Sequence, residues 1–216
     1  DGEFVPYSDK VKCDSITEFS GIYRAIESKG NYELWREHCL KLRENIYLRL
    51  TMAASFAAPL IEIIGGLPFI VHLWGGTGTG KTVALCVAAS VWGKGAYNNN
   101  ALIQSFRGTE YALSEKAAFL YSLPVIIDEG QTVKNKDDFD TLIMNLTEGK
   151  GKIQGSASGG IKKLRHWANC FITTAEENII KYNSGGGTSN RIINIAAQSK
   201  IINDGHITMQ IIRDNY

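Results

Sequence analysis

The sequence lacks the features that mark several specialised classes of protein. None of its four cysteines lies in a C-x-x-C pair, so neither a zinc site nor a compact disulfide framework is indicated, and we expect reduced thiols in a cytoplasmic protein. The formal net charge is only +1, so a contact with nucleic acid would have to come from a local patch. The composition, 44% hydrophobic and 21% charged, is that of a globular protein.

An uninterrupted membrane-spanning run is also missing. The most apolar stretch, residues 51–72, is broken by Pro59, Glu62, Gly65, Gly66 and Pro68, whereas a spanning helix needs about 20 predominantly apolar residues in sequence. We therefore expect no membrane segment here.

What the sequence does contain is an alternation of short apolar runs with helical patterns. Strands are expected at residues 69–74, 125–127, 168–173 and 192–196, with a weaker one at 101–106. Helices are expected at residues 81–92, 109–122 and 137–146, preceded by two packing helices at 31–50 and 52–64. This order predicts an α/β fold with a mainly parallel five-stranded sheet covered on both faces. The expected parts are an N-terminal lead-in with packing helices (1–66), a core (67–200), and the start of a C-terminal lid or linker (201–216).

A glycine-rich segment between the first strand and the following helix matches the pattern G-x-x-x-x-G-K-[ST] at every fixed position. Glycines let consecutive backbone N–H groups turn inward and cradle phosphate oxygens, and the helix directs the positive end of its dipole at them. Lys81 would place its charge between the β and γ phosphates, and the Thr82 hydroxyl would ligate Mg²⁺. The predicted nucleotide site comprises Gly75, Gly76, Thr77, Gly78, Thr79, Gly80, Lys81, Thr82 and Val83. A chance glycine-rich hairpin is the alternative, and the flanking strand and helix argue against it.

An acidic pair, Asp128 and Glu129, follows the apolar run 125–127. Ligands of open α/β sheets bind at the carboxyl ends of strands. Asp128 would hold Mg²⁺ through water, and Glu129 would orient or deprotonate the water that attacks ATP. The pair favours hydrolysis over phosphotransfer to a small molecule, and an acidic turn without function is the alternative.

Two further segments carry basic residues. Arg191 follows a flexible glycine-containing loop and begins the last strand, as suits an arginine finger that stabilises transition-state charge on a neighbouring subunit's nucleotide; a solvated arginine is the alternative. Residues 149–166 read as a glycine-tipped β-hairpin. Its basic side chains, Lys150, Lys152, Lys162, Lys163 and Arg165, would track DNA phosphates without reading sequence, unless it is only a solvated surface hairpin.

Over residues 35–216 the chain resembles an AAA+ ATPase family, a domain of unknown function found in helicase-like proteins of phages and cassette-type mobile elements. The similar segments are residues 57–60, 72–75, 88–93, 123–131, 147–152, 166–167 and 173–176. The resemblance implies a P-loop NTPase fold of the ASCE/AAA+ type, a three-layer α/β/α sandwich. It also implies that the chain is a fragment whose helical lid is truncated.

Site roles follow from the same resemblance. A polar residue after strand 168–173 senses the γ-phosphate in AAA+ proteins, and Thr174 is expected to do so here, with Thr173 as the competitor. Alanine 175 replaces the glycine that is usual in the family. The family is similar to minichromosome-maintenance and superfamily III ring helicases, which insert a basic hairpin into their central channel.

These resemblances predict an ATP-driven DNA helicase or translocase that acts in replication of a mobile genetic element. It would act on single-stranded or forked DNA as a homo-hexamer in which Arg191 acts in trans. A nucleotide-controlled loader or regulator that assembles on protein partners is the alternative.

Overall fold

The computed structural model describes residues 19–96, 101–105, 109–128, 136–151, 164–180 and 186–216. They build an α/β fold around one sheet of five parallel strands in the order β2-β3-β4-β1-β5. The strands are β1 (Phe69–Trp74), β2 (Ile103–Ser105), β3 (Val125–Asp128), β4 (Cys170–Ala175) and β5 (Ile192–Ala196). The prediction of a parallel five-stranded sheet is confirmed.

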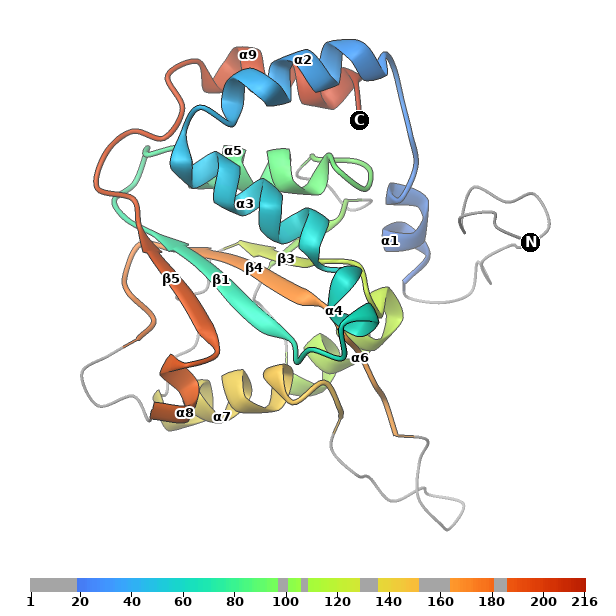
Figure 1. Ribbon diagram of the computed structural model, residues 1–216, viewed down its shortest axis with the longest axis vertical. Coiled ribbons are helices and arrows are strands. Elements are labelled where there is room, and N and C mark those ends of the chain that lie inside the picture. The colour runs from blue at the N-terminus through green and yellow to red at the C-terminus, as the bar shows by residue number, and fades with distance from the viewer. Residues whose placement is uncertain (1–18, 97–100, 106–108, 129–135, 152–163, 181–185) are drawn as a thin grey trace, which may run out of the picture.

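Helices cover both faces of this sheet, as Figure 1 shows. They are α1 (Ser20–Ala25), α2 (Tyr32–Leu42), α3 (Ile46–Ala57), α4 (Leu60–Ile63), α5 (Lys81–Ala89), α6 (Glu110–Leu120), α7 (Lys136–Thr147), α8 (Gly186–Ser189) and α9 (Gly205–Asp214). On one face α3 and α5 lie over the strands, and α2 and α9 form an outer layer above them; α6, α7 and α8 cover the other face (Figure 1). The segment predicted to begin a lid, which contains α9, therefore lies against α2 and α5.

The prediction of one helix over residues 31–50 is wrong, because the first helix ends at Leu42 and a second helix begins at Ile46. Asn45 caps the new helix: its side-chain oxygen accepts hydrogen bonds from the N–H groups of Tyr47 (2.9 Å) and Leu48 (3.4 Å). Pro59 causes a second break, between α3 and the short α4, because proline cannot donate the hydrogen bond that a continuing helix needs.

The core consists of the central strands and the helices beside them. Every residue of β3 and β4 is buried, as expected for strands covered on both faces. Cys39, Cys86 and Cys170 are buried free thiols, and burial raises the pKa of Cys39 and Cys86 to about 12. These thiols stay protonated and pack as small apolar groups; Cys13 lies outside the described residues.

No helix in the described part of the chain is long and apolar enough to cross a membrane. Because all five strands are parallel, their carboxyl ends meet at one edge of the sheet, which we call the carboxyl edge. The opposite one is the amino edge. The candidate site occupies the carboxyl edge.

Candidate functional site

The glycine loop, residues 75–80, connects β1 to α5 and has the backbone that its glycines were expected to supply. Gly78 and Gly80 have φ angles of +79° and +97°, in the left-handed region that favours glycine. At Gly75 the reason is space, because a Cβ there would lie 2.5 Å from the carbonyl oxygen of Ala197. Glycine is therefore required at Gly75 by close packing and at the other two by backbone conformation.

The side chain of Lys81, the first residue of α5, folds back over the glycine loop. Its Nζ donates hydrogen bonds to the carbonyl oxygens of Gly75 at 2.7 Å and Gly76 at 2.8 Å. The positive charge is thus held at the mouth of the loop and beside the amino terminus of α5, where the helix dipole adds to it. Such an arrangement attracts anions.

The outer side of the glycine loop is braced by the segment that follows β5. The Ile201 N–H donates to the Thr79 carbonyl at 2.8 Å, and Asn45 Nδ2 donates to the Ile201 carbonyl at 3.0 Å. A small apolar cluster seals this contact; its buried members are Leu48, Leu73, Ala84, Ala197, Ile201 and Ile202. The shape of the loop consequently depends on three distant parts of the chain.

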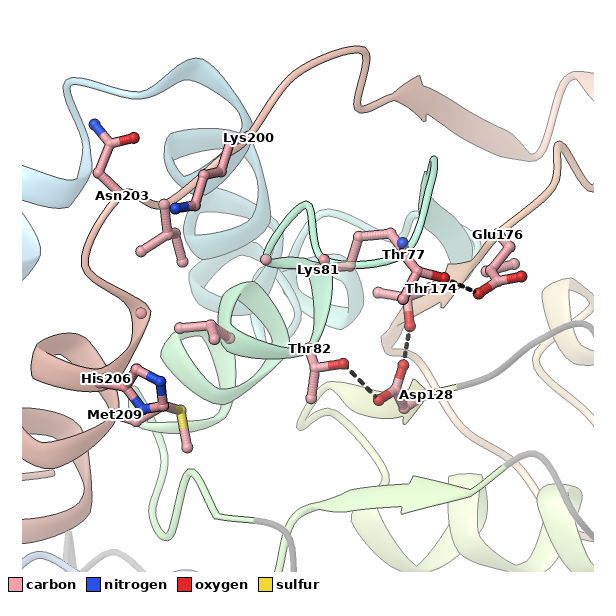
Figure 2. Close-up of a pocket in the computed structure, with 16 residues that line it drawn as sticks. Thr77, Lys81, Thr82, Asp128, Thr174, Glu176, Lys200, Asn203, His206 and Met209 are labelled. Atoms are coloured by element: carbon pink, nitrogen blue, oxygen red, sulfur yellow. Dashed lines mark hydrogen bonds between the residues drawn. The ribbon is translucent and has the colours of Figure 1, made fainter.

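Asp128, the last residue of β3, lies beside the glycine loop and is 7% exposed. Its Oδ2 accepts a hydrogen bond from Thr82 Oγ1 at 3.0 Å, and its Oδ1 accepts one from Thr174 Oγ1 (Figure 2). Hydroxyl and carboxylate oxygens are the ligand types that Mg²⁺ prefers, and Mg²⁺ usually keeps several of its waters. Thr82 and Asp128 thus bring suitable oxygens together, and a carboxylate so placed could also hold the ion through one of its waters.

The two threonines at the end of β4 point to opposite faces of the sheet, because side chains alternate along a strand. Thr174 points to Asp128, whereas Thr173 Oγ1 lies 2.8 Å from Nδ1 of the buried His72. His72 Nε2 lies 3.4 Å from the Glu177 carbonyl. Burial lowers the pKa of His72 to about 4, so its imidazole is neutral, and the carbonyl requires that Nε2 carry the proton. Of the two predicted sensor residues, only Thr174 lines the site.

One carboxylate of the site was not predicted. Glu176 follows β4, and its Oε1 accepts a hydrogen bond from Thr77 Oγ1 at the tip of the glycine loop (Figure 2). In the sequence it is one more acidic residue after a strand, and only its place two positions after Thr174 could have pointed to it. Glu176 thus links the end of β4 to the tip of the glycine loop.

These residues line a cavity of about 570 Å³, within the range of small-molecule sites. Its lining comprises Thr77, Gly78, Gly80, Lys81, Thr82, Val83, Asp128, Thr174, Ala175, Glu176, Lys200, Ile202, Asn203, Gly205, His206 and Met209. The residues from Lys200 onward were missed, because an ordinary amphipathic pattern carries no local signal that it will fold over a loop. No cluster of three or more His, Cys, Asp or Glu side chains that could hold a metal occurs among the residues the structure describes.

Arg191 does not reach this cavity within its own chain. Its carbonyl accepts a hydrogen bond from Ile70 near the start of β1, and the glycine loop begins after Trp74, about 13 Å further along the strand. The guanidinium donates to the Gly187 carbonyl at 3.2 Å and to the Met144 sulfur. Arg191 therefore stands at the amino edge, against α8 and α7.

The base of the predicted basic hairpin also leaves from the amino edge. Lys150 and His166 form an antiparallel bridge, supported by hydrogen bonds from Gly151 N–H to the Arg165 carbonyl and from Trp167 N–H to the Gly149 carbonyl. Lys150 is exposed. The described residues thus contain two antiparallel segments where a hairpin was predicted; Lys152, Lys162 and Lys163 lie outside them, as does Glu129.

Arg165 at the hairpin base is held by an acidic partner. Its Nη2 and Nε lie 2.9 and 3.0 Å from the two carboxylate oxygens of Glu115 on α6. This two-point contact turns the guanidinium toward α6 and fixes the hairpin base to the protein. Lys150, the other basic side chain described in this segment, is exposed to solvent.

The fold and the site define an α/β protein with a polar, glycine-lined cavity at the carboxyl edge of a parallel sheet. A family model described as "Domain of unknown function (DUF927)" matches residues 6–166, so the chain belongs to that family. No curated protein matches the sequence.

Among solved structures, the chain shares its fold with one described as "SCCmec type IV Cch - active helicase". The TM-score is 0.64 at 20% sequence identity, and the match covers 88% of this chain. The chain spans 36% of the length of that helicase.

Proposed function

We propose that this chain binds and hydrolyses ATP with Mg²⁺ as the motor domain of a DNA helicase or translocase, in a P-loop arrangement of the AAA+ type. The observation that carries the proposal is the contact of Thr82 with Asp128, 3.0 Å apart at the mouth of the glycine loop. A hydroxyl and a carboxylate from two elements converge there beside the Lys81 ammonium, which is the combination that a Mg²⁺-bound triphosphate requires.

Each side chain of the site has a proposed task. The glycine loop and Lys81 hold the phosphates, and Thr82 with Asp128 holds the metal, which would neutralise charge on the β and γ phosphates. Thr174, fixed to Asp128, contacts the γ-phosphate. Glu129 follows Asp128 directly and would orient the attacking water. The division into residues 1–66, 67–200 and 201–216 belongs to this proposal as well.

Motion along DNA is proposed from the amino edge of the sheet. The hairpin base with its exposed Lys150 and the Arg191 side chain both lie there, at the opposite end of the strands from the nucleotide cavity. In a homo-hexamer, Arg191 would complete the nucleotide site of the neighbouring subunit, and the hairpins would contact single-stranded or forked DNA in replication of a mobile element. The fold shared with an active helicase supports this proposal.

A loader or regulator that assembles on protein partners is the second candidate, and one surface favours it. Five large apolar side chains between the end of α3 and the start of β1 are at least half exposed. They are Phe56, in the last turn of α3, and Leu60, Ile63, Ile64 and Leu67 after it. Exposed apolar side chains that gather on one segment can mark contact with another protein.

ATP hydrolysis by the protein with and without single-stranded DNA separates the two candidates. A motor should hydrolyse ATP faster with DNA, and Lys152→Ala combined with Lys162→Ala should reduce the stimulation while leaving the basal rate. Lys81→Ala should abolish both rates. An assembled protein that hydrolyses ATP without any response to DNA would favour the loader, and a wild-type protein that binds no nucleotide would contradict both.

A further inference from the structure

The nucleotide cavity has two chemically different ends, as Figure 2 shows. Asp128, Thr174 and Glu176 lie on one side of Lys81 and Thr82. Lys200, Asn203, His206 and Met209 lie on the other side (Figure 2). If the phosphates lie in the glycine loop with the terminal phosphate toward the first group, the nucleoside must extend toward the second.

The wall at that second end is apolar where it is buried. Ile202 is 5% exposed and packs beside Gly80, and the half-buried Val83 of α5 and Met209 of α9 also line the cavity. Gly205 adds no side chain next to Val83; a Cβ at Gly205 would lie 3.6 Å from Val83 Cγ2. The surface offered to a flat ligand consists of methyl, methylene and thioether groups.

The polar side chains of this end stand at its rim. Lys200, Asn203 and His206 line the cavity but are exposed, so water competes for each hydrogen bond that they could make to a base. A hydrogen bond made in such a place contributes little net free energy, whereas a buried polar group left unpaired by the wrong ligand would impose a large penalty.

We infer that the base of the bound nucleotide rests on Val83, Ile202 and Met209 and is held through its face. The site would therefore accept nucleoside triphosphates with little regard to the base. Every base has a flat π-face, so contact of this kind is tolerant of base identity. Apolar pockets separate similar ligands by roughly 10- to 200-fold at most, while sites that read a ligand through buried hydrogen bonds reach 10⁴-fold or more. This inference rests on the proposed nucleotide site and adds to it the class of nucleotide.

The test is calorimetric titration of the protein with the Mg²⁺ complexes of ADP, GDP, CDP and UDP, and with pyrophosphate as a probe that has no base. The four nucleotides should bind within about tenfold of one another and more tightly than pyrophosphate. One base preferred by more than about 100-fold would overturn the inference. Pyrophosphate binding without any gain from a base would overturn it too, while leaving the phosphate site intact.

Met209→Ala gives the sharper comparison, because Met209 stands on α9 and Ile202 packs against the glycine loop itself. It should weaken all four nucleotides by a similar factor, about 5- to 20-fold for loss of most of a side-chain contact, and leave pyrophosphate unchanged. Ile207→Ala is the matched control on the same helix, since Ile207 is 56% exposed and does not line the cavity. If Met209→Ala leaves nucleotide affinity unchanged, or if Asn203→Ala or His206→Ala removes a preference for one base, the inference is wrong. A wild-type protein that binds neither the nucleotides nor pyrophosphate would instead contradict the proposed function.

Discussion

Thr174 donates a hydrogen bond to the carboxylate of Asp128, a residue 46 positions away in the sequence. Asp128 also accepts a hydrogen bond from Thr82. This one carboxylate therefore links β4, which carries Thr174, with α5, which carries Thr82. If loss of the terminal phosphate of the proposed nucleotide moved Thr174, the positions of both Asp128 and Thr82 would change with it.

This relationship predicts different outcomes for two neighbouring substitutions. Thr174→Val should lower kcat for ATP hydrolysis by about 10²- to 10³-fold, because it removes the hydroxyl that holds Asp128 and that is proposed to contact the γ-phosphate. It should change nucleotide affinity only a few-fold. Thr173→Val is the matched control: it removes the hydrogen bond to His72, costs about 1 kcal/mol of stability and should leave kcat near the wild-type value. Equal losses of kcat in both variants would contradict this assignment.

The glycine loop offers a second matched pair. Gly75→Ala should lower the free energy of unfolding by about 1–3 kcal/mol, because the added methyl would overlap the Ala197 carbonyl, and nucleotide binding should fall with it. Gly76→Ala should fold normally, since nothing lies within 4 Å of a Cβ at that position. The denaturant midpoints of the two variants test this prediction. A Gly75→Ala protein as stable as the wild type would show that the close approach to Ala197 does not require glycine at this position.

His72 predicts a loss of stability in acid. The unfolded chain binds a proton at His72 near pH 6.5 and the folded chain only near pH 4, so between these values the unfolded state binds more protons and stability falls as pH falls. The loss from this group should reach about 3 kcal/mol and be complete near pH 4. Denaturant unfolding at pH 7.5 and pH 5 measures most of it.

His72→Gln should flatten this pH dependence. His38 is a necessary control, since burial and the nearby Lys41 lower its pKa too. The His38→Gln protein should still lose most of this stability in acid, because His38 is only partly buried. An unchanged slope in the His72→Gln protein would show that the loss originates at another residue.

Arg191 is predicted to act on a neighbouring subunit. Arg191→Ala should lower ATP hydrolysis by about 10³-fold or more if the guanidinium stabilises the transition state, and Lys81→Ala should abolish it. Mixed in one assembly, the two inactive variants should regain activity, because some nucleotide sites then combine an intact Lys81 with an intact neighbouring Arg191. Failure to regain activity in mixed assemblies would limit Arg191 to its contacts with Gly187 and Met144.

The parts of the molecule that the sequence predicts well are those determined by adjacent residues. Strand β1, the glycine loop and α5 follow one another in the chain, and each has its own local pattern, so their order and spacing predict the structure. The buried apolar run of β3 likewise predicts that Asp128 stands at the carboxyl edge. Parallel strands then place Asp128 and the glycine loop at the same edge of the sheet, but their distance from each other depends on β4, which lies between β3 and β1.

Features that depend on distant residues could not be predicted. Asn45 interrupts an otherwise helical pattern, and its side chain is held by Ile201 from the other end of the chain. The alternation of a strand shows that Thr173 and Thr174 point to opposite faces, but which face carries the cavity depends on how β4 sits between β1 and β3. At the apolar end of the cavity, Ile202 and Met209 lie on the segment after β5, whose sequence pattern gives no sign of that location.

The brace between Ile201 and the glycine loop has a consequence for the order in which the protein folds. Asn45 and Ile201 are 156 residues apart, so during synthesis the loop emerges long before the segment that holds its outer side. Contacts between such distant residues form late, since closing so long a stretch of chain costs entropy that few earlier contacts repay. A nascent chain that has completed β1, α5 and β3 still lacks β4, the strand that pairs with both β1 and β3. Its glycine loop would gain the outer support only after the last strand and the residues beyond it leave the ribosome.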